Sequence, residues 1–308
     1  MTLLIFSCNR ALQLQTLLHS LLTCLTVEGG YSVHVLYAAS DDVYELGYQQ
    51  IGQQYAHVKF HRERQQRQWA WPKPFSYWKN LYRYLSHASL QQTGDFKALT
   101  EKIIAESRHE GVMFLTDDSL FTRPVQLDAN RMAQVINDPA GKHAYSLRHG
   151  LTLQPKPTDI QVGNAGKCQW QLQPGQPELG HWTWRFSVDG HLYSRRTLLP
   201  ILRRLTYANP NSLEGFVQEY IANVRPDLFA TLLFDAQPSL VGFILNKVQT
   251  YNGNRSLDVS PAYLNEKLLA GYRLTYLYQQ PATDFQPKLT GVALTHALTG
   301  ERELITVA

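Results

Sequence analysis

The first sixty residues change repeatedly between the apolar spacing of a strand and that of a helix. Residues 3–6 form a continuous apolar run, typical of a strand that is buried on both faces. Leucines then recur at helical spacing over residues 12–25, up to Gly29 and Gly30. The order repeats with an alternating strand over residues 31–37, a polar amphipathic helix over 43–54 and a third strand over 58–60. Successive β–α units predict an α/β fold with a mostly parallel central sheet flanked by helices.

The pattern continues as far as a pair of adjacent carboxylates. Helical stripes are predicted over residues 75–85 and 96–109. Residues 112–115 then form a second buried apolar run, which stops at Asp117 and Asp118. Ligands bind outside the carboxyl ends of strands in open α/β sheets, so an acid pair there is well placed to hold a cation beside a phosphate. The alternative is that one of these acids caps a turn.

The second half of the chain has weaker periodicity. A helix near residues 128–138 and a strand over 144–147 are predicted, whereas residues 150–183 are rich in Pro, Gly and Gln and predict a long loop. Asp189-Gly190 is typical of a hairpin turn. The remaining predictions are helices over 198–205 and 263–270, a helix that begins near Ser212, and a strand from Leu240 that leads to Asn246, Lys247 and Gln249. We treat residues 1–149 and 150–308 as a nucleotide-binding half and an acceptor-binding half of one domain.

Polar residues follow the first two strands as well. Ser7, Asn9 and Arg10 lie in the turn before the first helix, where backbone N–H groups and a guanidinium suit an anion. Asp41 and Asp42 follow the second strand and are candidates for contact with a ribose or a base. Each of these residues is equally explained as a helix cap or a solvated first-turn residue. Because they follow parallel strands, all of them are expected on the edge that carries the acid pair.

Glu214 is a candidate general base. It follows Ser212 at the start of a helical apolar pattern, so it is predicted in the first turn, where it either stabilises the helix dipole or projects into the site. Glu219 is a second candidate on the same helix.

Composition narrows the functional classes. The 308 residues carry 29 basic and 25 acidic side chains, a net charge of +4, with no clustered basic face, which argues against a nucleic-acid partner. The three cysteines, Cys8, Cys24 and Cys168, have no paired spacing, which favours a reducing compartment over a disulfide framework or a zinc site. The initial apolar run is too short for a signal sequence or a membrane span. A cytoplasmic protein with at most peripheral membrane contact is expected.

Five motifs together resemble the bacterial glycosyltransferases of the GT-A fold, with a C-terminal extension on the acceptor side. They are F-S-C-N-R, V-L-Y-A-A-S-D-D-V-Y-E-L-G-Y, F-L-T-D-D-S, S-L-E-G-F and F-I-L-N-K-V-Q-T-Y-N-G-N-R, in that order. Where that family usually has a D-x-D pattern, this chain has Thr-Asp-Asp-Ser over residues 116–119. The resemblance implies a nucleotide-sugar donor, a UDP- or GDP-sugar, and a divalent cation, Mn²⁺ or Mg²⁺.

The resemblance also implies residue roles. Ser7, Asn9 and Arg10 would hold the nucleotide, and Asp41 or Asp42 its base or ribose. Asp117 and Asp118 would serve the ribose and the metal; Asp118 is the candidate metal ligand, but the departure from D-x-D leaves open which of the two acids touches the metal. Glu214 matches the base of an inverting enzyme, which takes a proton from the acceptor hydroxyl.

A late histidine completes the metal shell in this fold, and His296 is the candidate. Two other functions stay open: a sugar-1-phosphate nucleotidyltransferase, which would lack its G-x-G-T-R-type loop here, and a non-catalytic carbohydrate-binding protein. The donor sugar, the saccharide or other hydroxyl acceptor, and the oligomeric state do not follow from the sequence.

Overall fold

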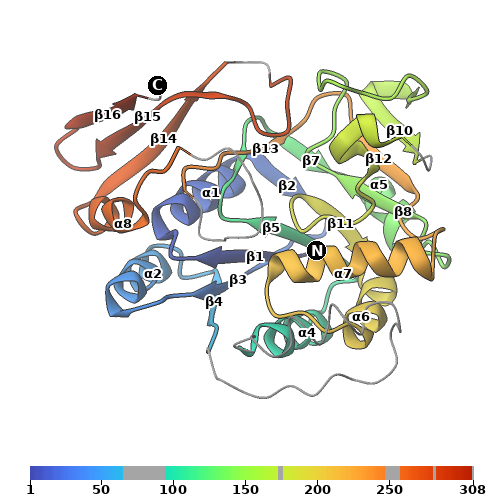
Figure 1. The fold of residues 1–308 in the computed structure, drawn as a ribbon, viewed down its shortest axis with the longest axis horizontal. Coiled ribbons are helices and arrows are strands. Elements are labelled where there is room, and N and C mark those ends of the chain that lie inside the picture. Colours follow the sequence, from blue (N-terminus) through green and yellow to red (C-terminus); the bar gives the residue numbers. More distant parts are fainter. Residues whose placement is uncertain (65–93, 173–175, 247–256, 280–281, 307–308) are drawn as a thin grey trace.

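A nine-stranded mixed sheet forms the centre of the molecule, with strand order β4-β3-β1-β5-β11-β8-β12-β10-β9 (Figure 1). The structure is a computed structural model that describes residues 1–64, 94–172, 176–246, 257–279 and 282–306. The chain is therefore an α/β protein. Strands from both sides of residue 149 belong to this one sheet, because β8 lies between β11 and β12.

The N-terminal β–α units have the predicted order and direction. Strand β1 (Thr2–Cys8) pairs in parallel with β3 (Ser32–Ala38) on one side and with β5 (Gly111–Thr116) on the other. The connecting helices are α1 (Ala11–Cys24) and α2 (Asp42–Gln54), and the third strand is β4 (Lys59–Arg62), parallel to β3. The carboxyl ends of β1, β3 and β5 consequently share one edge.

The prediction of a mostly parallel sheet is wrong, because the sheet is mixed. Strand β11 (His191–Ser194) runs antiparallel to both β5 and β8 (His143–Ser146). The chain reaches β11 at the carboxyl end of β5, where the Gly190 amide donates to the Phe114 carbonyl at 2.8 Å. Gly190 has φ of 72°, a conformation that a residue without Cβ adopts readily. From that point the chain runs back along β5.

The predicted long loop over residues 150–183 contains a strand inside the sheet. Strand β10 (Lys167–Gln171) lies between β12 (Thr231–Asp235) and β9 (Gln161–Val162) and is antiparallel to both. Its buried residues Cys168 and Trp170 alternate with Lys and Gln. This period-2 pattern is typical of a strand, but the surrounding Pro, Gly and Gln residues obscured it.

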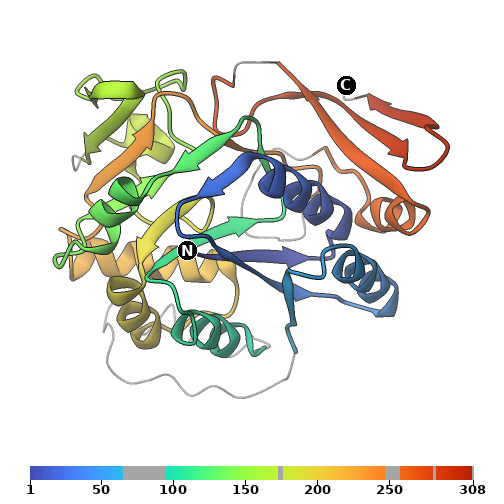
Figure 2. The same ribbon diagram turned by 180° about the vertical axis from the view of Figure 1, so that it is seen from behind.

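Two separate hydrophobic cores cover the two faces of the sheet. Leu3 and Ile5 of β1 belong to the core that includes α1 and α2, whereas Leu4 and Phe6 belong to the core with α4, α6 and α7. In Figure 1 helix α7 passes in front of the sheet, and in Figure 2, from behind, α1 does. Burial on both faces is the reason that β1 is apolar at successive positions. The second group of helices spans Phe96–Ala105 (α4), Arg195–Arg204 (α6) and Pro210–Asn223 (α7).

The C-terminal part adds a small antiparallel sheet of β14 (Tyr272–Tyr278), β15 (Leu289–His296) and β16 (Arg302–Thr306) beside α8 (Pro261–Leu269). Phe243 stacks on Tyr276 of β14 with ring centroids 4.6 Å apart. The other elements are β6 (Ser119–Phe121) paired with β13 (Leu240–Gly242), β2 (Leu25–Val27) paired with β7 (Val125–Leu127), α5 (Ala129–Ile136) and the 3-10 helices Asn164–Gly166 and Pro177–Thr183. The three-stranded C-terminal sheet places β14 near the carboxyl ends of the central strands.

Some predictions fall outside the described residues, namely the helix over 75–85 and the polar residues Lys247 and Gln249. Within the described ranges, no helix combines the length and the apolar character needed to cross a bilayer.

Candidate active site

The acid pair lies at the carboxyl end of β5, as predicted, and Asp117 is only 3% exposed. Phe6 is the register partner of Thr116, so the residues that follow them, Ser7 and Asp117, are neighbours. Asp117 Oδ2 accepts hydrogen bonds from Ser7 Oγ at 2.8 Å and from the Cys8 amide at 3.2 Å. The parallel pairing of β1 with β5 therefore builds this contact directly from the backbone register.

Arg10 forms an ion pair with each carboxylate. Its Nη1 lies 3.1 Å from Asp117 Oδ1 and 3.2 Å from Asp118 Oδ2, and the residue is 7% exposed. The same guanidinium donates from Nε to Asn246 Oδ1 at 2.7 Å and from Nη2 to the Asn246 carbonyl oxygen. Gln13 Nε2 also donates to Asn246 Oδ1, at 3.3 Å. Arg10 is thus held in one orientation by groups from two distant parts of the chain, the acid pair and Asn246.

A tyrosine that the sequence did not single out supports this turn. Tyr48 of α2 is 1% exposed, and its hydroxyl lies 2.6 Å from Ser7 Oγ and accepts from the Arg10 amide at 3.1 Å. Burial raises the pKa of Asp117 to about 6, although the Arg10 guanidinium acts in the opposite direction. Tyr48 was hidden in the helical stripe of α2, where an aromatic residue usually indicates core packing alone.

The other N-terminal candidates lie at the rim of this edge. Asn9 has φ of 55°, and its Oδ1 accepts from the Ser40 amide at 2.9 Å. Asp41 is the N-cap of α2, since its Oδ1 accepts from the amides of Val43 and Tyr44 at 3.0 Å each. Asp42 is exposed in the first turn of the same helix. The structure realises the capping alternative for Asp41.

We expect Asp41→Ala to lower the free energy of unfolding by about 1 kcal/mol, because two amides at the start of α2 lose their acceptor. Asp42→Ala is the matched control, since that carboxylate is exposed and supports the helix dipole alone. Urea unfolding of both variants measures the difference. An Asp41→Ala variant as stable as the wild type would contradict the capping role.

Asp189 forms a second buried acidic group next to the pair. It is 9% exposed; its Oδ1 accepts from Ser119 Oγ and its Oδ2 pairs with Arg148 Nη1. Arg148 Nη2 also donates to the Phe285 carbonyl at 2.7 Å. The sequence indicated only a turn at Asp189-Gly190, and no local pattern pointed to the ion pair with Arg148. Burial raises the pKa of Asp189, and the nearby charge of Asp118 adds to this rise, whereas Arg148 opposes it.

Glu214 reaches the same edge from α7. Its Oε1 accepts from the Val188 amide at 3.2 Å, beside Asp189. Burial raises the pKa of Glu214 from 4.5 to about 7; a hydrogen bond from Ser187 opposes this rise and the charge of Asp189 adds to it. A carboxyl group that titrates near neutral pH is suited to proton transfer.

The predicted position of Glu214 within its helix is wrong by one turn. Asn209 is the N-cap of α7, and a capping box joins it to Ser212, so Glu214 lies beyond the first turn. The proline at the first helical position and the asparagine before it set this earlier start. Glu219 lies five residues on, about 140° around the helix from Glu214. It therefore projects from a different face.

His296 is not brought to the acid pair. It ends β15 opposite Tyr272, and its Nδ1 accepts from the Thr299 amide at 3.1 Å. The tyrosine of that sheet that lies near the acid pair is Tyr276, four residues further along β14: burial raises its pKa, and the charges of Asp118 and Asp117 add to the rise. Four strand residues span about 13 Å. Tyr276 is buried, with 6% exposure, and the sequence did not single it out.

A cation at this edge would depend on Asp118. In the described part of the chain, no group of three His, Cys, Asp or Glu side chains is placed to hold a metal ion. The Asp118 side chain is 21% exposed, and Arg10 occupies its Oδ2. A carboxylate at the rim fits Mg²⁺ or Mn²⁺, which bind through one or two carboxylates and take their other ligands from phosphates and water. His296 is not part of that set.

Comparisons with known proteins give only distant similarity. No protein-family model matches the chain, and no curated protein matches it. The solved structures that match include Staphylococcus aureus TarS, with 10% identity, a TM-score of 0.40, and coverage of 87% of this chain and 42% of that one. TarS 1–349 in complex with UDP-GlcNAc has 11% identity, a TM-score of 0.41 and coverage of 88% and 71%. TarS 1–349 alone has 10% identity, a TM-score of 0.39 and coverage of 88% and 70%.

This chain therefore spans less than half of the longest TarS chain. At these TM-scores the likeness carries no conclusion about activity.

Proposed function

We propose that this protein is a glycosyltransferase that moves a sugar from a nucleotide-diphosphate sugar to a hydroxyl acceptor, with inversion and with a divalent cation. One observation carries the proposal. A single edge of the sheet gathers the acid pair, which is bridged by Arg10, and a carboxyl group, Glu214, whose pKa is about 7. Sugar transfer needs a site for the cation and diphosphate of the donor and a base for the acceptor hydroxyl. We assign the first to the acid pair and the second to Glu214.

The donor half of the site is preorganised. Asp117 fixes Ser7 and Arg10, so the groups that we expect to contact the nucleotide keep their orientation before the donor binds. Asp42, exposed at the start of α2, is better placed than the capping Asp41 to receive a base or ribose donor. Asn9 lies at the rim, where its Oδ1 accepts from the Ser40 amide. A UDP- or GDP-sugar would lie across the ends of β1 and β3.

The acceptor half provides the base. Glu214 is about half ionised at pH 7, so it accepts a proton from an acceptor hydroxyl without first paying a large deprotonation cost. Attack from the face of the sugar opposite the diphosphate inverts the anomeric centre. A cation on Asp118 would supply charge neutralisation for the leaving diphosphate. The residues of this chain do the rest: Arg10 bridges the acid pair, and Asp189 and Arg148 fix the loop that faces Glu214.

A thermal-shift screen tests the proposal without knowledge of the acceptor. The protein is heated with UDP, GDP, CDP or dTDP and their common sugars, each with Mn²⁺, Mg²⁺ or EDTA. A ligand present at about 100 times its Kd stabilises the folded state by about 2.7 kcal/mol, so we expect one nucleotide to raise the Tm by several degrees in the presence of metal. No shift with any nucleotide would contradict the donor site. Release of free nucleoside diphosphate then separates an enzyme from a pure binding protein.

A further inference from the structure

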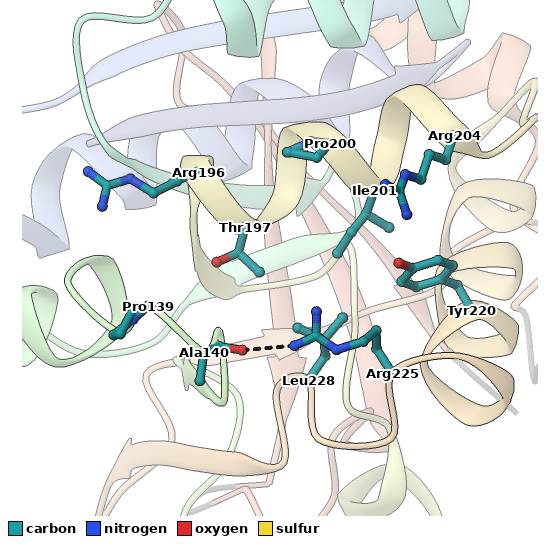
Figure 3. Close-up of a pocket in the computed structure, with 10 residues that line it drawn as sticks. All are labelled: Pro139, Ala140, Arg196, Thr197, Pro200, Ile201, Arg204, Tyr220, Arg225 and Leu228. Carbon is teal, nitrogen blue, oxygen red and sulfur yellow. Dashed lines mark hydrogen bonds between the residues drawn. The ribbon is translucent and has the colours of Figure 1, made fainter.

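A second pocket lies away from the acid pair, between helices α6 and α7. It has a volume of about 250 Å³, and Figure 3 shows its lining. Three arginines surround it, Arg196, Arg204 and Arg225. Its other lining residues are Pro139, Ala140, Thr197, Pro200, Ile201, Tyr220 and Leu228. The pocket is slightly smaller than those that hold drug-sized ligands.

The pocket adjoins the edge of the sheet opposite the candidate active site. Helix α6 follows β11, whose last residue, Ser194, pairs with Gly111, the first residue of β5. The other lining segments precede β8 and β12, which run parallel to each other. The acid pair follows the far end of β5, and a six-residue strand is about 20 Å long. A ligand in this pocket is therefore separate from a donor bound at the acid pair.

Arg204 and Arg225 line the pocket from α6 and from the segment that follows α7. Figure 3 shows Arg204 folded back along α6 toward Ile201, and Arg225 extended below it toward Ala140. Side chains of a helix point toward its N-terminus, which explains how Arg204, at the end of α6, reaches the middle of the pocket. Tyr220 lies beside Arg204 and Arg225 and is 8% exposed.

Arg225 is held in place by its neighbours. Its Nε and Nη2 each lie 3.0 Å from a carboxylate oxygen of Asp227, and Nη2 also donates to the Ala140 carbonyl at 3.3 Å (Figure 3). These contacts fix the plane of the guanidinium, while Nη1 makes no hydrogen bond within the described residues. The arginine is consequently oriented before a ligand arrives.

The charge of the other two arginines is not balanced locally. In the described residues no carboxylate pairs with Arg196 or Arg204, in contrast to Arg195, which pairs with Glu110. Arg196 lies in the first turn of α6, where a cation opposes the helix dipole. Planar guanidinium groups match the oxygens of phosphate in two-point contacts. Pro200, Ile201 and Leu228 add apolar surface to the lining.

We propose that this pocket binds the phosphate group of a small phosphorylated molecule, held between Arg204 and Arg225. The apolar lining contacts the organic part of that molecule. Binding here is independent of the donor site and does not require the protein to be a glycosyltransferase. A phosphate group can come from a soluble metabolite or from a lipid headgroup, and the test distinguishes these two sources.

Arg204→Gln, with Arg203→Gln as its matched control, tests the proposal. Both arginines lie in the last turn of α6, but only Arg204 lines the pocket. Tripolyphosphate is titrated into the full-length protein by calorimetry, in EDTA and in the Asp118→Ala background, so that binding at the acid pair does not contribute. Loss of a charge-assisted contact weakens binding roughly 10- to 100-fold, so we expect that loss for Arg204→Gln and unchanged affinity for Arg203→Gln.

A parallel arm uses sedimentation with phosphatidic acid vesicles, against phosphatidylcholine vesicles. Vesicle binding that is lost in Arg204→Gln, without binding of tripolyphosphate, assigns the phosphate to a lipid and supports the pocket. Equal affinity of the two variants for every probe overturns the proposal, as does the absence of binding to both probes. Arg225→Gln is a second variant, and its Tm is compared with that of the wild type so that a folding defect is recognised.

Discussion

Replacing Glu214 by glutamine is expected to reduce sugar transfer by about two to four orders of magnitude, the usual contribution of a general base. Glutamine keeps the size of the side chain and its acceptor oxygen for the Val188 amide, but it cannot take a proton. Donor affinity should remain unchanged, because the acid pair and Arg10 are not altered. Transfer rates and nucleotide Kd values, measured on the same preparations, check both statements.

The pH dependence gives an independent readout of the same residue. The base must be ionised to act, so transfer by the wild type should rise as the pH passes through about 7 and level off above it. The residual activity of Glu214→Gln should lack this rise. Glu219→Gln is the matched control, because Glu219 projects from a different face of α7, and it should keep the wild-type rate and profile. Wild-type transfer by Glu214→Gln would rule out the role.

Folding stability provides a further check on Glu214. Its folded-state pKa of about 7 exceeds the ordinary 4.5, so between these values the folded protein binds more protons than the unfolded chain. The stability that this proton provides is present at low pH and is lost as the pH rises through 7. A shift of this size corresponds to about 3 kcal/mol. Unfolding free energies at pH 5 and pH 8 should therefore differ less in Glu214→Gln than in the wild type.

The part of the fold that follows from the sequence is the part with continuous local patterns. The apolar runs of β1 and β5, the alternation of β3 and the leucine stripe of α1 predicted parallel strands joined by helices. The runs of β1 and β5 are continuous because both faces of those strands are buried. Register then placed Ser7 next to Asp117. The prediction that polar residues after these strands share one edge followed from strand direction alone.

The rest depends on contacts between distant segments. Arg148 and Asp189 are 41 residues apart, and Arg10 and Asn246 are 236 apart; no local pattern links either pair. Tyr276 lies in a small sheet that the sequence did not predict. Strand β10 was missed because its buried residues alternate with glutamine and lysine in a Pro- and Gly-rich segment. Tertiary packing, and not local preference, decided those elements.

Replacing Asp118 by alanine is expected to remove the metal-dependent part of donor binding while leaving the fold intact. Asp118 is the more exposed acid of the pair, and Arg10 keeps its contacts with Asp117 and Asn246 when Asp118 is lost. Asp117→Ala differs, because it removes the acceptor of Ser7, of the Cys8 amide and of Arg10 together. A folding defect is therefore expected for Asp117→Ala and not for Asp118→Ala.

The size of the Asp118→Ala effect follows from the charge that a cation provides. Metal ions contribute several kcal/mol to the stabilisation of a leaving diphosphate, which corresponds to two or more orders of magnitude in transfer rate. Asp118→Asn keeps the volume and an acceptor for Arg10 but removes the charge, so it should show the same loss. Transfer rate and nucleotide affinity, each with Mn²⁺ and with EDTA, are the measurements for the wild type and both Asp118 variants. A variant that keeps the wild-type response to EDTA would place the cation elsewhere. His296 is not expected to bind a cation at the acid pair in either case, because it lies about 13 Å along β15 from the residue that pairs with Tyr276.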